Sequence, residues 1–128
     1  MARATRIGGI VLCGGFSTRM GRPKAWLPFG DEVLLPRVVR RLSEVVTPVV
    51  VVAAQGQELP SLPDSASVVR DAWEACGPLA GLAAGLAALE GHCDAAYATA
   101  CDVPGLQPAF VRRVAGLLDD YDGVVPRD

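Results

Sequence analysis

The stretch Ile7-Gly8-Gly9-Ile10-Val11-Leu12-Cys13-Gly14-Gly15 is a short apolar run that ends in two glycines. An apolar run of this length predicts a strand that is buried on both faces, as in a parallel sheet. The segment that follows, as far as Gly30, is rich in glycine and proline and predicts a long loop. We therefore expect a strand whose carboxyl end opens directly into a glycine-rich loop.

Helical and strand-like patterns alternate along the rest of the chain. An amphipathic helix that stops at Pro48 is predicted by apolar residues at a 3.6-residue period, namely Leu35, Val38, Val39, Leu42, Val45 and Val46. Residues 49–54 predict a second buried strand, and residues 67–70 a short third strand, with a loop from Asp71 onward.

The second half continues the alternation. Pro78 opens a second predicted helix, whose inner face we expect to be formed by Leu79, Leu82, Leu86 and Leu89. The small residues among them would let another element approach closely. Residues 95–101 predict a fourth strand, Pro108 starts a third helix, and residues 123–126 predict a fifth strand.

This order predicts an α/β fold, a Rossmann-like, mostly parallel sheet with helices on both faces, in a single domain over residues 1–128. Ligands of such sheets bind beyond the carboxyl ends of the strands. Gly14-Gly15, Asp71 and Asp102 each follow a predicted strand, so we expect them to gather at one edge.

Composition places the chain among ordinary globular proteins. Of the 128 residues, 51% are hydrophobic and 20% are charged. The apolar runs are shorter than the ~20 residues of a membrane span, and the amino terminus lacks a secretory pattern. We therefore expect a cytoplasmic protein without membrane contact. The four cysteines form no C-x-x-C pair, so small buried side chains are a better interpretation than zinc ligands.

Charge is unevenly distributed. Residues 1–41 carry a net charge of +6 and the remainder −8. Nucleic-acid binding by the basic part is one interpretation, but the acidic remainder argues against it. Arg37, Arg40 and Arg41 have the spacing of one helix face and predict a solvated surface.

The glycine-rich loop has the composition of a phosphate site. Gly14 and Gly15 allow the backbone N–H groups to approach an anion, and Ser17 adds a hydroxyl donor. Arg19 and Lys24 add the positive charge that a triphosphate needs. Neither the P-loop pattern nor G-x-G-x-x-G is present. The alternative is a glycine-rich turn with incidental surface charge.

Two acids follow other strands. Asp102, held by a turn through Pro104, is well placed to bind Mg²⁺ on phosphates, although a lone acid there is often a cap. Asp71 precedes Gly77-Pro78-Leu79-Ala80-Gly81, a glycine-flanked helix start that could approach a ribose or phosphate, or could merely pack on the sheet.

Together these segments resemble the molybdenum cofactor guanylyltransferase family, whose pattern is roughly L-A-G-G-x-S-x-R-M-G-x-x-K. The matching residues are Leu12, Gly14, Gly15, Ser17, Arg19, Met20, Gly21 and Lys24, while Cys13 replaces the usual alanine. Leu27-Pro28-Phe29-Gly30, Asp71 with the Gly77–Gly81 segment, and Cys101-Asp102-Val103-Pro104 are also similar.

The resemblance implies a GT-A-like nucleotidyltransferase that moves GMP from Mg-GTP to the phosphate of molybdenum-bearing molybdopterin and releases pyrophosphate. It assigns Leu12, Cys13, Gly14, Gly15, Ser17, Lys24, Asp71 and Asp102 to the nucleotide. It further assigns catalytic charge neutralisation to Arg19, Lys24 and Asp102, and Mg²⁺ to Asp102. The partners it implies are GTP, the molybdopterin acceptor and molybdoenzyme-maturation proteins.

The chain departs from the family in two ways. Members of the family continue past residue 128, so the acceptor-binding part is expected to be missing, and a bare last strand would favour self-association. In addition, only Gln55 is available after the second strand to recognise guanine. The alternatives are a cytidylyl or sugar-phosphate nucleotidyltransferase, and a non-catalytic nucleotide-binding module.

Overall fold

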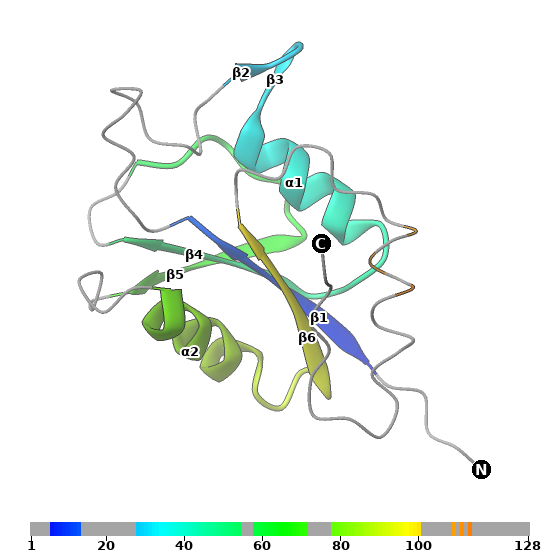
Figure 1. The fold of residues 1–128 in the computed structure, drawn as a ribbon, viewed down its shortest axis with the longest axis vertical. Helices are drawn as coiled ribbons and strands as arrows, with labels where there is room; N and C mark the ends of the chain where they lie inside the picture. The colour runs from blue at the N-terminus through cyan, green and yellow to red at the C-terminus, as the bar shows by residue number, and fades with distance from the viewer. Residues whose placement is uncertain are drawn as a thin grey trace.

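The computed structural model describes residues 6–13, 28–54, 58–71 and 78–100, together with 109, 111 and 113. Its elements, in chain order, are β1 (Ile7–Leu12), β2 (Pro28–Phe29), β3 (Glu32–Val33), α1 (Leu34–Ser43), β4 (Val49–Ala54), β5 (Ala66–Asp71), α2 (Pro78–Leu89) and β6 (Ala95–Ala100). Four strands form a parallel sheet in the order β5-β4-β1-β6. Helices α1 and α2 cover its opposite faces (Figure 1). The predicted α/β fold is thus confirmed.

The core consists of two apolar layers, one on each face of the sheet. Successive strand residues point to opposite faces, so Val11 and Val51 pack with α1, whereas Ile10 and Val50 pack on the α2 side. All the β1 residues from Gly8 to Val11 are buried, as expected for a strand covered on both faces.

Helix α1 is held to the sheet by its apolar stripe, in which Leu35, Val38, Val39 and Leu42 are fully buried. Pro36 is tolerated because first-turn N–H groups have no helical partner. Arg40 and Arg41 lie in the last turn, where positive charge interacts favourably with the helix dipole. The helix ends at Ser43, five residues before Pro48, and Val46 remains buried beyond that end.

Residues 28–33 form a β2–β3 hairpin, where the sequence predicted only a loop as far as Gly30. Its turn uses Gly30 at φ +61°, a conformation that glycine adopts without strain. Glu32 of β3 accepts hydrogen bonds from Arg37, at 3.1 Å, and from Arg40. Two of the arginines predicted to be merely solvated therefore tie the hairpin to α1.

Helix α2 packs on the sheet through a face that contains two glycines. Gly81, Gly85 and Leu89 are buried at four-residue spacing and therefore share one helix face. Leu86 is 49% exposed, so its predicted place on the inner face is wrong. After Leu89 the chain turns through Gly91 at φ +83°, a common way to end a helix.

The other predicted elements of the described chain are confirmed with small shifts at their ends. The strand predicted over 67–70 extends to Ala66 and Asp71, and the helix at Pro78 runs to Leu89. Positions 109, 111 and 113 are helical, while the rest of the third predicted helix and the fifth strand lie outside the described residues. Within the part that is described, no helix is long and apolar enough to cross a membrane.

Candidate functional site

The four parallel strands end together at one side of the sheet, called the carboxyl edge here. In the register of the sheet, Leu12 of β1 lies opposite Val52 of β4 and Ala100 of β6, and Ala54 lies opposite Asp71 of β5. In Figure 1 the chain leaves this edge after β1, β4, β5 and β6. The ligand-binding side of a parallel sheet is therefore formed by the segments that follow Leu12, Ala54, Asp71 and Ala100.

Leu12 and Cys13 introduce the glycine-rich loop. The backbone N–H of Cys13 donates a 2.8 Å hydrogen bond to the carbonyl oxygen of Val52, so pairing with β4 continues beyond the end of β1. The Cys13 side chain is 5% exposed and packs in the α1-side core. Leu12 is half-buried and packs on the α2 side. Cys13, which directly precedes Gly14-Gly15, is thus held by both the sheet and the core.

Asp71 is the last residue of β5, paired with Ala54, rather than the first residue of a loop. The shift has a simple cause, since β5 follows β4 along its whole length from Ala66 onward. Asp71 therefore lies at the carboxyl edge, two strands away from Cys13.

The other predicted site residues, Gly14, Gly15, Ser17, Arg19, Lys24 and Asp102, lie outside the described residues, and their roles remain predictions. Their chain neighbours are described, however. Gly14 directly follows Cys13, and Asp102 is two residues after Ala100, which is the β6 partner of Leu12. The segments that carry the glycine loop and Asp102 thus depart from adjacent strands.

No cluster of three or more metal-ligating side chains occurs among the residues that the structure describes. Asp71 is an acidic residue at the carboxyl edge that lies within the described part of the chain. Carboxylate oxygens suit a hard cation such as Mg²⁺ better than a thiolate-binding metal. The donor chemistry of Asp71 and Asp102 is therefore compatible with the predicted cation.

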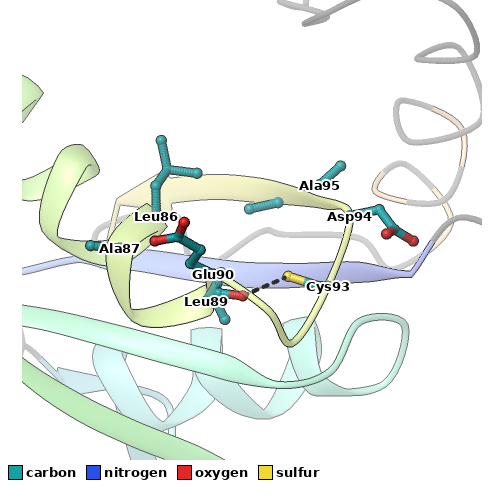
Figure 2. Close-up of a pocket in the computed structure, with 8 residues that line it drawn as sticks. Leu86, Ala87, Leu89, Glu90, Cys93, Asp94 and Ala95 are labelled. Carbon is teal, nitrogen blue, oxygen red and sulfur yellow. Dashed lines mark hydrogen bonds between the residues drawn. The ribbon is translucent and has the colours of Figure 1, made fainter.

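A cavity of about 340 Å³ lies at the opposite, amino edge of the sheet. Figure 2 shows it between the last turn of α2 and the start of β6, lined by Leu86, Ala87, Leu89, Glu90, Cys93, Asp94, Ala95 and Ala96. The Asp94 carboxylate accepts a 2.9 Å hydrogen bond from the backbone N–H of Arg6, and the Cys93 thiol points to the Leu89 carbonyl at 3.8 Å. These polar groups hold the turn together, and the cavity is separate from the carboxyl edge.

Two described groups have clearly shifted pKa values, and neither belongs to the carboxyl edge. Hydrogen bonds from Arg40 and Arg37 lower the pKa of Glu32, against the opposing effect of its desolvation. Burial raises the pKa of Tyr97, which lies opposite Gly9 within the sheet. The Glu32 shift follows from its arginine partners and the Tyr97 shift from burial, so neither indicates an acid–base catalyst.

Comparison with known proteins is consistent with this geometry. Residues 9–128 match the model of a family described as "MobA-like NTP transferase domain". A probable molybdenum cofactor guanylyltransferase from Mycobacterium avium (strain 104) is 43% identical over 128 residues, which cover 98% of this chain and 64% of that relative. This chain therefore spans less than two thirds of the length of that relative.

Solved structures show the same fold. The crystal structure of Rv0371c from Mycobacterium tuberculosis H37Rv has a TM-score of 0.67 at 24% identity, over 91% of this chain and 62% of that one. A hypothetical transferase from Thermus thermophilus has a TM-score of 0.66 at 29% identity, over 88% of this chain and 46% of that one. This chain thus shares its fold with proteins of known structure.

Proposed function

The chain belongs to the MobA-like NTP transferase family, and from this premise we propose that it binds Mg-GTP at the carboxyl edge of its sheet. We further propose that it serves in the transfer of GMP to the phosphate of molybdenum-bearing molybdopterin. The name of the Mycobacterium avium relative supports guanylyl transfer. Because the chain spans 64% of that relative, nucleotide binding and transfer require separate tests.

One observation carries the proposal, namely the pairing of β1 with β6. It makes Leu12 and Ala100 direct neighbours at the carboxyl edge. Gly14-Gly15 then begins two residues after one neighbour, and Asp102 stands two residues after the other. Phosphate-binding backbone N–H groups and a cation-binding carboxylate are both needed for a metal-bound triphosphate. Neither feature alone distinguishes a nucleotide site from a simple turn.

The proposed contacts follow from the chemistry of each group. The backbone from Leu12 to Gly15 faces the nucleotide, and Ser17 adds a hydroxyl donor. Because the Cys13 N–H donates to Val52, the N–H groups proposed to donate to phosphate oxygens are those of Gly14 and Gly15. Arg19 and Lys24 neutralise charge on the triphosphate, Arg19 with a planar fork of donors and Lys24 as a compact point charge. Asp71 contacts the nucleotide from the end of β5.

The proposed reaction needs no strong general base. An oxygen of the acceptor phosphate, already anionic, forms a bond to the α-phosphorus of GTP. The bond from that phosphorus to the bridging oxygen breaks, and pyrophosphate leaves with the electron pair. The residues of the chain act by holding the two phosphates in line and by neutralising the leaving group. Mg²⁺, when held by Asp102, supplies further charge neutralisation.

Guanine recognition is assigned to Gln55, which directly follows the last residue of β4. β4 lies between β1 and β5, so Gln55 follows a strand that ends between Cys13 and Asp71. A side-chain amide can both donate and accept hydrogen bonds, as the Watson–Crick edge of guanine requires.

The test is calorimetric titration of the chain with GTP, CTP, UTP and ATP in the presence of Mg²⁺. We expect GTP to bind most tightly, and Gln55→Ala to reduce the preference for GTP over CTP. Release of pyrophosphate is then measured after molybdenum-bearing molybdopterin is added. Tighter binding of CTP would assign the chain to a cytidylyl reaction instead, and absence of binding to all four nucleotides would refute the proposal.

A further inference from the structure

Helix α2 contacts β1 through a position that has no side chain. A Cβ atom added at Gly85 would lie 2.8 Å from Cγ2, 3.0 Å from Cδ1 and 3.2 Å from Cγ1 of Ile10. All three nearest atoms belong to this one residue. A separation of 2.8 Å is closer than two carbon atoms can pack, because their optimal distance is 3.5–4.0 Å. The backbone of α2 at Gly85 therefore rests directly against the Ile10 side chain.

Ile10 has little freedom to move aside. It is fully buried and packs in a cluster with Val50, Val52 and Leu89. Its β-branched side chain is also restricted at χ1. A methyl group at position 85 would consequently be accommodated by movement of the helix rather than of Ile10.

Local helix preference does not explain the glycine. Alanine stabilises a helix better than glycine does, and α2 already carries Ala83, Ala84, Ala87 and Ala88 around this position. Glycine stands where the helix meets Ile10. Packing against β1 is thus the physical requirement that position 85 meets.

The contact between Gly85 and Ile10 sets how far the start of α2 lies from the end of β1 at the carboxyl edge. From Gly85 back to Pro78, the start of α2, a helix rises about 10 Å, and from Ile10 forward to Cys13 a strand also advances about 10 Å. The helix and the strand run in opposite chain directions, so both of these ends reach the same edge. The Gly85–Ile10 contact therefore fixes the spacing between the first turn of α2 and the entry to the glycine-rich loop.

We propose that Gly85 is a positioning residue for the nucleotide site, since it sets the distance between the start of α2 and the end of β1. The inference rests on the proposed function, because it assumes that the nucleotide binds at this edge. Gly85 itself touches no substrate. Its effect reaches the site through the placement of the helix.

The experiment compares Gly85→Ala with Ala83→Gly. The control changes the same helix at an exposed position and weakens its helix preference without a contact to Ile10. Affinity for Mg-GTP is measured by calorimetry under conditions in which circular dichroism shows every variant to be folded. We expect Gly85→Ala to weaken binding about tenfold or more and Ala83→Gly to leave it within about twofold.

A second substitution tests the mechanism by rescue. Ile10→Ala removes all three atoms that the new methyl group would meet, so the Gly85→Ala/Ile10→Ala double variant is expected to regain most of the lost affinity. If the cavity left by Ile10→Ala prevents folding, Ile10→Leu serves instead, because it removes the Cγ2 branch at nearly constant volume. Simple loss of stability would make the two effects add, whereas relief of the contact makes them compensate.

The outcomes are distinguishable. The positioning role is overturned if Gly85→Ala binds Mg-GTP as tightly as the unchanged chain does. It is also overturned if Ala83→Gly loses as much affinity as Gly85→Ala. In both cases the proposed function stands. Failure of the double variant to regain affinity also overturns the positioning role. If the unchanged chain binds no nucleoside triphosphate, the proposed function fails, and the positioning role fails with it.

Discussion

The backbone N–H of Cys13 lies 2.8 Å from the carbonyl oxygen of Val52, so the hydrogen bonding of β1 to β4 extends to the last residue before Gly14-Gly15. The Cys13 side chain points into the α1-side core and is 5% exposed. The loop thus starts from a fixed backbone position, and the identity of residue 13 matters through packing. A thiol at this position is compatible with the alanine of the family pattern.

Cys13→Ala is therefore expected to keep the affinity for Mg-GTP within about twofold and to lower the free energy of unfolding by about 1 kcal/mol, the value of one small buried group. Calorimetric titration and urea unfolding measure the two quantities. A larger loss of affinity with normal stability would show that the thiol itself contacts the ligand. In the folded protein, Cys13 should also react with iodoacetamide far more slowly than in urea.

Asp102→Ala is expected to abolish Mg-dependent pyrophosphate release, because the proposed cation loses its carboxylate. Asp64→Ala is the matched control, since Asp64 is exposed in the turn before β5, at the amino edge. Both variants are assayed over a range of Mg²⁺ concentrations. Turnover that stays metal-dependent in Asp102→Ala would show that the metal assignment is wrong.

Lys24→Ala is expected to weaken Mg-GTP binding about ten- to a hundredfold, as loss of a charge-assisted contact to phosphate of roughly 1.5–3 kcal/mol implies. GMP binding should change much less, because the charge is proposed to act on the outer phosphates. Arg113→Ala, at an exposed helical position, is the control for loss of one positive charge. Equal losses in both variants would indicate a long-range charge effect rather than a contact.

Gly9→Ala is expected to destabilise the fold by about 1–3 kcal/mol, the usual cost of overpacking a core. The new Cβ would lie 2.7 Å from Cδ2 of Leu42 and 3.0 Å from Cγ2 of Val46, both of them buried. Gly8→Ala is the neighbouring comparison, because its nearest contact is the thiol of half-buried Cys93 at 2.8 Å. We expect a smaller loss there, and urea unfolding that ranks the two variants the other way would contradict this packing.

The β2–β3 hairpin predicts a dependence of stability on pH. Arg40 and Arg37 lower the pKa of Glu32 in the folded protein. The ionised carboxylate is therefore more stable in the folded state than in the unfolded state. The stabilisation is present above the unfolded value of about 4.5 and is lost as pH falls through the lower folded value.

Unfolding of the unchanged chain and of Glu32→Gln is to be compared from neutral to acidic pH. The difference in free energy should be greatest at neutral pH, should begin to fall near pH 4.5, and should vanish only when the pH is below the lower folded pKa of Glu32. Added salt should reduce it, because exposed ion pairs are screened. A difference that persists unchanged in acid would show that the carboxylate charge is not responsible.

Much of the fold could be predicted from local patterns. Residues 49–54 are apolar without interruption and are a strand in the structure, and the proline at 78 begins a helix as expected. The β2–β3 hairpin was missed because its strands have only two residues each, too few to show an alternating pattern. Its one local signal is Gly30-Asp31, a pair suited to a tight turn.

The candidate site could be predicted only in part. Glycines, a lysine and acids after strands favour phosphate and cation chemistry by residue type, but a glycine-rich turn and a capping acid have the same composition. That β6 pairs with β1, and not with β5, is a long-range property. Sequence periodicity carries no information on strand order, so the adjacency of Leu12 and Ala100 required the tertiary structure.

The two helices differ in how far their sequences determine the face that meets the sheet. In α1, Arg37, Arg40 and Arg41 leave a single apolar stripe, so the sequence by itself determined which face meets the sheet. Helix α2 is apolar on every side, so the leucine spacing that predicted its inner face was not decisive, and Leu86 was placed wrongly. Only packing against Ile10 decided that Gly85 turns inward and Leu86 outward, because the closest approach of helix and strand requires the position without a side chain.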